Sequence, residues 1–234
     1  MELDTGAKIE AAFFRLVDTE ADDPELTLLG EAASDVIDQL LTRGFRAAQR
    51  WMLNKGHQGW RKRSAAITWS GSDAANGGTY SALPADFMKA YGNGRMSCLE
   101  EANGDRWGSE IDPDEIARRG SHYYFRGSDD GGMQIWRGKA SQSPATLYLD
   151  YHYKHPSWKD LADGDIDFPM EIRALPVAIA ANFAKEEAWF PAGQEGEVKI
   201  VRALGLAEEE AMRTVKASRK PRMMRAPRRY GNHW

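Results

Sequence analysis

The chain has little cysteine and no long apolar run. Its 234 residues include one cysteine, Cys98, which excludes an intrachain disulfide and a zinc site built on several thiolates. The longest apolar stretch, residues 175–184, is interrupted by Asn182 and has about half the length that spans a bilayer. The first residues lack the basic and apolar regions of a secretory signal. We expect a soluble protein that is made in the cytoplasm and does not enter a membrane.

Sequence signatures of catalysis are also absent. The chain has no H-E-x-x-H, no G-x-S-x-G and no G-x-G-x-x-G motif. Gly138-Lys139 is followed by Ala140, and no glycine stands five residues before Gly138, which excludes a phosphate-binding P-loop. We expect no catalytic residue and no cofactor, and therefore a protein that is not an enzyme.

Two local patterns have the residue types of metal sites but poor spacing. His152 and His155 are three residues apart at the end of a predicted strand, where such neighbours face opposite sides. The acidic run 163–167 would need Gly and Glu further on to form a calcium loop, and those positions hold Phe168 and Ala174. We expect no metal ligands here, but core or solvated histidines and a polar turn in which residue 167 or 168 begins a helix.

A hydrolase remains an alternative on residue types alone. Aspartate and glutamate are abundant, and a pair of carboxylates can cleave glycans when their separation in space is right. Four tryptophans in or near the predicted strands, Trp69, Trp107, Trp136 and Trp158, could form a platform for sugar rings. Large aromatic side chains more often fill a core or a subunit interface, and we expect that role for them.

Apolar periodicity divides the chain into helical ends and a β-rich middle. A spacing near 3.6 residues predicts helices over 7–17, 22–56, 169–190 and 195–217. Short β-branched or aromatic runs bounded by turn residues predict strands at 66–70, 79–83, 122–126, 133–137 and 146–153. Residues 84–89 are interpreted as a short helical turn and 93–120 as a long loop.

This order predicts an α+β fold. We expect an antiparallel helical bundle with a β-rich insertion between the first long helix and the C-terminal helices, followed by an extended arm. The expected divisions are an N-terminal helical region of the bundle (residues 1–64), the β-rich insertion (65–160), the C-terminal helices (161–218) and the basic docking arm (219–234).

The last 22 residues are strongly basic. They hold eight of the 31 lysines and arginines and no acidic residue, so the rest of the chain has a formal charge of −12. Pro221 and Pro227 disfavour helix there, and the last sixteen or so residues, fully extended, reach about 50 Å. Such a tail can bind nucleic-acid phosphates, dock on a protein or only solubilise the chain. Docking is favoured because methionine, tyrosine and tryptophan, which anchor interfaces, lie among the charges.

Several segments together resemble the head-to-tail adaptor (connector) proteins of tailed bacteriophages, of the tail tubular protein A type. They are Leu-Pro-Ala-Asp-Phe at 83–87 after a strand, the hairpin from Tyr-Tyr-Phe at 123–125 to Ile135, and Leu-Tyr-Leu-Asp-Tyr-His-Tyr at 147–153. An acidic run then precedes Phe-Pro-Met-Glu at 168–171 and an alanine-rich helix. The resemblance covers residues 26–191 and rests on the order and spacing of these segments.

The resemblance implies a structural virion protein at the head–tail interface. Such proteins form a ring, commonly a dodecamer, beneath the portal; they attach the tail or nozzle protein, and DNA passes through their channel without sequence-specific binding. Their C-terminal segment clasps the portal, which implies portal-binding roles for Arg222, Met223, Met224, Arg225, Arg228, Arg229, Tyr230 and Trp234. The alternatives left open are a virion peptidoglycan hydrolase and a nucleic-acid-binding protein that uses the basic tail.

Overall fold

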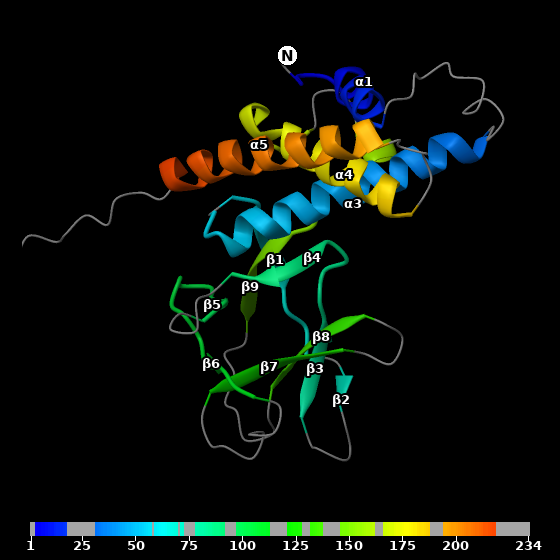
Figure 1. Ribbon diagram of the computed structural model, residues 1–234. Coiled ribbons are helices and arrows are strands. Elements are labelled where there is room, and N and C mark those ends of the chain that lie inside the picture. The colour runs from blue at the N-terminus through cyan, green and yellow to red at the C-terminus, as the bar shows by residue number, and fades with distance from the viewer. Residues whose placement is uncertain are drawn as a thin grey trace, which may run out of the picture. The chain divides into compact units, whose positions relative to one another are not determined.

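The computed structural model describes residues 3–17, 31–57, 59–69, 71–72, 78–91, 97–112, 121–127, 132–137, 146–161, 166–187 and 194–218. The chain forms two compact units, a helical unit, Met1–Gln58 with Leu161–Trp234, and a β unit, Gly59–Asp160. The predicted α+β class is confirmed, with N-terminal helices, two β-sheets in the middle and C-terminal helices (Figure 1). None of the helices described combines the length and the apolarity needed to cross a membrane.

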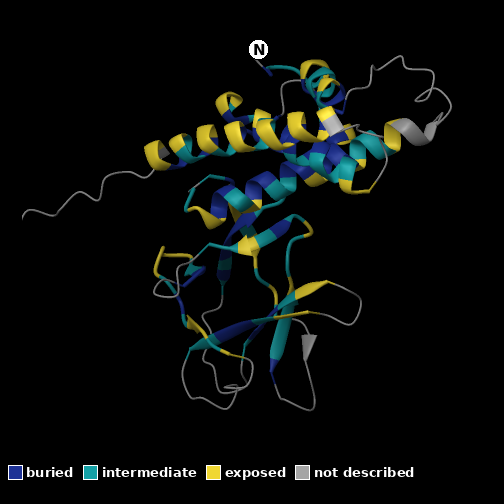
Figure 2. Cartoon of the chain, in the orientation of Figure 1, coloured by how far each residue is buried: buried dark blue, intermediate teal, exposed yellow. Residues whose placement is uncertain are grey.

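The helical unit is built around α4. It comprises α1 (Gly6–Leu16), α3 (Glu31–Asn54), α4 (Ala174–Glu186) and α5 (Gln194–Ser218), with the 3-10 helix η3 (Met170–Ile172) before α4. α4 packs against α1, α3 and α5, and most of its residues are buried. α5 instead buries one side and exposes a long face (Figure 2). The helices predicted at 7–17 and 195–217 are confirmed to within a residue at each end, and the predicted start of the long helix at residue 22 lies outside the described residues.

Small residues let α3 and α4 approach closely. A Cβ added to Gly44 of α3 would overlap the carbonyl oxygen of Pro176 and lie 2.8 Å from the Cβ of Ala180. Ala180 and Ala184 of α4 are fully buried. Glycine and alanine are therefore required at this contact because a larger side chain would force the helix backbones apart.

The predicted start of the fourth helix at residue 167 or 168 is wrong. Pro169 is the residue before the short 3-10 helix, and α4 itself begins at Ala174. An α-helix that began at Pro169 would need an N–H at Pro176 to donate to Ile172, and proline has none. With the start at Ala174, Pro176 falls in the first turn, where amide groups have no partner within the helix.

Arg173 joins three segments of the helical unit. Its guanidinium and Nε donate to the carbonyl oxygens of Phe168 and Ile166 at 2.9 and 3.0 Å, and to those of Leu3 and Asp4 at 2.9 and 3.2 Å. The side chain thus satisfies carbonyls of the N-terminal segment and of the turn before η3 at once. Arg173 directly precedes α4, and its side chain makes no capping hydrogen bond to that helix.

The β unit contains two sheets (Figure 1). In the first, β9 (Leu147–Tyr153) pairs with β1 (Arg61–Ala66), β4 (Phe87–Ala90) and β5 (Leu99–Glu101), all antiparallel. The second has the order β2 (Gly71–Ser72), β3 (Thr79–Ala82), β8 (Met133–Arg137), β7 (His122–Gly127) and β6 (Ser109–Glu110). The 3-10 helix η2 (Trp158–Asp160) ends the unit. The strands predicted at 79–83, 122–126, 133–137 and 146–153 are confirmed to within a residue at each end.

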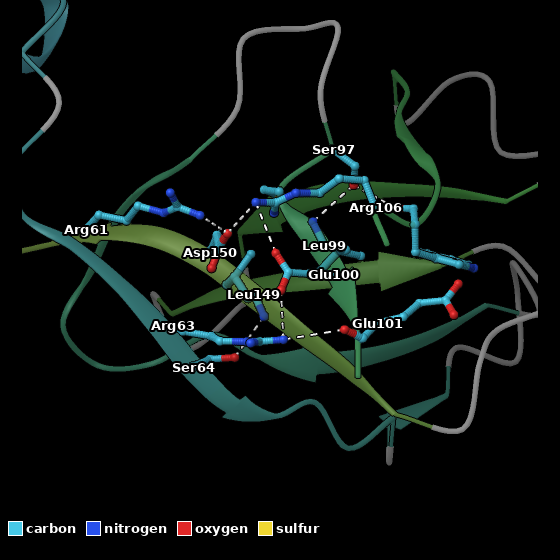
Figure 3. A network of polar contacts seen from close by, with 12 residues as sticks. Arg61, Arg63, Ser64, Ser97, Leu99, Glu100, Glu101, Arg106, Leu149 and Asp150 are labelled. Atoms are coloured by element: carbon cyan, nitrogen blue, oxygen red, sulfur yellow. Dashed lines mark hydrogen bonds and ion pairs between the residues drawn. The ribbon is translucent and has the colours of Figure 1, made fainter. Parts of the chain in front are cut away.

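The first predicted strand is misplaced, because β1 is Arg61–Ala66 rather than 66–70. It starts inside the stretch 1–64 that we expected to be helical. Arg-Lys-Arg-Ser has no strand preference, and its conformation comes from pairing with β9. A bulge separates the pairs Arg63↔Asp150 and Ala66↔Tyr148, and there the Ser64 hydroxyl accepts from the Leu149 amide at 2.9 Å (Figure 3).

Two further predictions in the β unit are corrected. Residues 84–89 do not form a helical segment: a turn closes where the Phe87 amide donates to the Pro84 carbonyl at 2.9 Å, and β4 follows. The predicted loop 93–120 contains β5 and β6 and buries Cys98, Leu99 and Trp107. Strands of two or three residues carry no periodicity that a sequence pattern can show.

The core of the β unit is built from side chains of both sheets. It contains Phe87, Cys98, Leu99, Trp107, Tyr123, Ile135, Leu147, Leu149 and Tyr151. Trp107, Trp136 and Trp158 are 5–8% exposed, and Trp69 packs on this core with the Arg137 guanidinium over its ring. Trp107, Trp136 and Trp158 thus have the buried role expected for them, whereas Trp69 is only half-buried.

Candidate functional site

The predicted docking residues lie beyond the described residues of the chain. Arg222, Met223, Met224, Arg225, Arg228, Arg229, Tyr230 and Trp234 all follow Ser218, where α5 and the described residues end. The docking arm 219–234 therefore stays a prediction from sequence.

The outer face of α5 presents large aliphatic side chains to solvent. Val198, Val201 and Leu206 are 68, 60 and 62% exposed, and they are three of the five exposed large hydrophobic residues in the described ranges. Val198 and Val201 are adjacent on the helix surface because they are three residues apart. The opposite side of α5 is buried through residues such as Ile200 and Ala211. Leu206 lies about 80° from Val198 and about 140° from Val201 around the helix, so we call only Val198 and Val201 the α5 outer face.

The apolar residues whose spacing predicts a helix over 195–217 include these three exposed residues together with Ala211 and Val215. The structure separates them, because Ala211 and Val215 are fully buried. On a helix of 3.6 residues per turn, Val198 and Ala211 differ by about 140°. Val201, however, lies only about 40° from the buried Val215, so a helical projection of the sequence does not by itself separate the exposed apolar residues from the buried ones.

The β unit holds a chain of five charged side chains (Figure 3). The Asp150 carboxylate, 5% exposed, accepts from Arg61 and from Arg106, the latter at 2.7 Å. Arg106 also contacts Glu100 at 3.1 Å, and Glu100 contacts Arg63 at 3.0 Å. Two carboxylates thus lie between three guanidinium groups, and the network connects β1, β5 and β9.

The electrostatics of this network do not suit acid catalysis. Burial acts to raise the pKa of Asp150, but hydrogen bonds from Arg61 and Arg106 outweigh it and hold that pKa below its ordinary value. A general acid needs a raised pKa so that it keeps its proton near neutral pH. The carboxylates of Asp150 and Glu100 are instead ion-paired, which gives them a structural role in joining the strands.

The two histidines bind different backbone groups. His152 is 7% exposed, its Nδ1 lies 2.9 Å from the Gly59 carbonyl, and burial lowers its pKa. His155 is 1% exposed, and its Nδ1 lies 3.2 Å from the Pro156 carbonyl. A carbonyl only accepts, so each Nδ1 carries the proton and donates it. Across the described residues, no group of three or more histidine, cysteine or acidic side chains is arranged to hold a metal ion.

Cys98 is an unreactive member of the core. Burial raises the pKa of its thiol to about 12, so the nucleophilic thiolate is not formed near neutral pH. Its Sγ and amide lie 3.3 and 3.2 Å from the Tyr123 hydroxyl, which also contacts the Ser97 hydroxyl at 3.3 Å. This buried polar group was not foreseen from the sequence, and it links the segment before β5 to β7.

No protein-family model matches the chain, and no curated protein matches its sequence. The α5 outer face and the order of the elements are therefore the observations on which a function is proposed.

Proposed function

We propose that the chain is a ring-forming head-to-tail adaptor of a tailed bacteriophage. In this proposal it docks on the portal through its C-terminal arm, attaches the tail and lines the channel through which DNA leaves the head. It acts as a structural virion protein at the head–tail interface.

The observation that carries the proposal is the α5 outer face. Aliphatic side chains that are exposed to this degree on one helix lose contact with water when a neighbouring subunit covers them. This burial stabilises the association by about 25 cal/mol per Å² of apolar surface. A face that contacts a different surface on the next copy builds a ring when the rotation closes. The order of elements, with a β-rich insertion between N-terminal and C-terminal helices, also agrees with the expected resemblance to head-to-tail adaptors.

Charge also supports the proposal. Residues 1–212 have a formal charge of −12, whereas the tail has +8. Acidic channel walls would repel the phosphates of passing DNA and so avoid retaining it. The basic tail would be attracted to an acidic surface on the portal, and its aromatic residues would slow release.

The α5 outer face gives a direct test. Changing Val198→Ser together with Val201→Ser should abolish ring assembly while the subunit stays folded, since both side chains are mostly exposed in the subunit. Ala217→Ser, at an exposed position near the end of the same helix, is the matched control and should assemble normally. Sedimentation velocity with and without purified portal measures the outcome. Normal rings from the double variant would exclude this face as the subunit contact.

A further inference from the structure

A groove opens in the β unit where two neighbouring strands separate. β2 and β3 pair at two positions, Gly71↔Tyr80 and Ser72↔Thr79. Beyond them the two arms diverge, because β1 pairs with β9 while β3 pairs with β8. A groove of about 420 Å³ lies between the arms, lined by residues 62–67 on one side and by 81–84 with Asp86 on the other. We call this groove the fork.

Backbone N–H groups point into the fork from both arms. The Ile67 amide donates to Leu147, and alternate residues of an antiparallel strand point away from the partner strand, so Ala66 directs its N–H away from β9. On the other arm, the Leu83 amide donates to the Met133 carbonyl of β8. By the same alternation, the N–H of the preceding residue, Ala82, points away from β8. Among the described strands none pairs with the outer side of β1. The fork thus offers two strand edges to one inserted strand.

The floor of the fork is apolar. Ile135, Leu149 and Tyr151 line it, and each is at most 2% exposed because it belongs to the core. Ile67 and Leu83 lie at its sides. An inserted strand could therefore place one apolar side chain against the core while its backbone bonds to the edges, which is how sheets bind added strands.

The rim of the fork carries two exposed cations and one carboxylate, Asp86. The side chains of Lys62 and Arg63 are 55 and 44% exposed on β1, although each has one acidic partner, Asp86 and Glu100 respectively. Exposed cations on an edge strand repel the same strand of a second copy. They attract a segment that carries carboxylates on both sides of an apolar residue.

We propose that the fork binds an extended acidic segment of a partner protein, which adds as a strand between β1 and β3. This site does not depend on the adaptor function.

A pair of blocked peptides tests the site with the intact chain. The probe is acetylated and amidated Asp-Val-Thr-Val-Asp-Glu, and the control replaces its three acidic residues with lysine. Amide hydrogen exchange should slow in 61–67 and 80–84 with the acidic peptide only, and the effect should weaken as NaCl is raised. No slowing, or equal slowing by both peptides, would overturn the proposal. Slow amide exchange of the same segments in the protein without peptide, lost on dilution, would also overturn the proposal. The fork would then be occupied by a second copy of the chain.

Two variants locate the binding. Ala82→Tyr should fill the fork and weaken peptide binding at least tenfold, whereas Ala102→Tyr, at an exposed position outside the fork, should leave it unchanged. Lys62→Glu should lose the acidic peptide and gain the lysine peptide, and it keeps the test informative if Ala82→Tyr fails to fold. Wild-type affinity for the acidic peptide in a folded Ala82→Tyr or Lys62→Glu variant would contradict the assignment.

Discussion

The same substitution, glycine to alanine, should have opposite effects at two positions of the helical unit. Alanine favours a helix over glycine by about 1 kcal/mol in an open environment. Nothing lies within 4 Å of a Cβ added to Gly205 on α5, so Gly205→Ala should raise the free energy of unfolding by about 0.5–1 kcal/mol. At Gly44 the added Cβ would overlap the Pro176 carbonyl, and overpacking of this kind costs about 1–3 kcal/mol.

The clash at Gly44 cannot be relieved by a side-chain rotation, because the Pro176 atom is backbone and Ala180 lies 2.8 Å away on the same helix. α3 and α4 would have to separate, and buried contacts along α4 would loosen. Gly44→Ala should therefore lower the free energy of unfolding by up to about 2 kcal/mol net of its propensity gain. Urea unfolding followed by circular dichroism at 222 nm would show the two midpoints moving in opposite directions. A shift of both in the same direction would refute the close approach of α3 and α4.

Three other predictions concern the β unit and the tail. Ser64→Ala should lower the free energy of unfolding by about 1–2 kcal/mol, since the Leu149 amide loses its acceptor at the bulge, and Ser64→Thr, which keeps the hydroxyl, should cost less in the same urea titration. The folded-state pKa of Asp150 is depressed, so its contribution to the free energy of unfolding is complete above about pH 4 and is lost as pH falls further. Asp150→Asn should therefore destabilise the protein at pH 7 and reduce the loss of stability at acid pH, measured by urea unfolding over a pH series. Deleting 220–234 should leave the thermal midpoint nearly unchanged, because the buried residues that the structure describes end at Val215. The same deletion should abolish portal attachment in a pull-down. Trp234→Ala alone should weaken attachment by about 2 kcal/mol or more.

Helices and most of the longer strands could be predicted because their own side chains carry the pattern. The aromatic and aliphatic residues of β9 predict a buried strand wherever it pairs. β1 could not be found this way, since Arg61 lies 89 residues from its partner Asp150 and its exposed side chains have no apolar alternation. Its conformation is set by tertiary pairing, which overrides local preference.

The start of α4 and the α5 outer face show two other reasons for a wrong or incomplete prediction. Pro169 and Pro176 both suit a first helical turn, and only the missing amide of Pro176 decides between them. On α5 the apolar residues were identified, but which of them face the bundle depends on where α4 lies. The candidate docking residues of the tail lie outside the described residues, so their assignment rests on charge and composition.

Native mass spectrometry of the chain, alone and after mixing with portal, tests the adaptor proposal most directly. The proposal predicts a ring of many copies, commonly twelve, that appears at the latest when portal is present and binds it as one body. A chain that stays monomeric or forms only a closed dimer in both samples would contradict it.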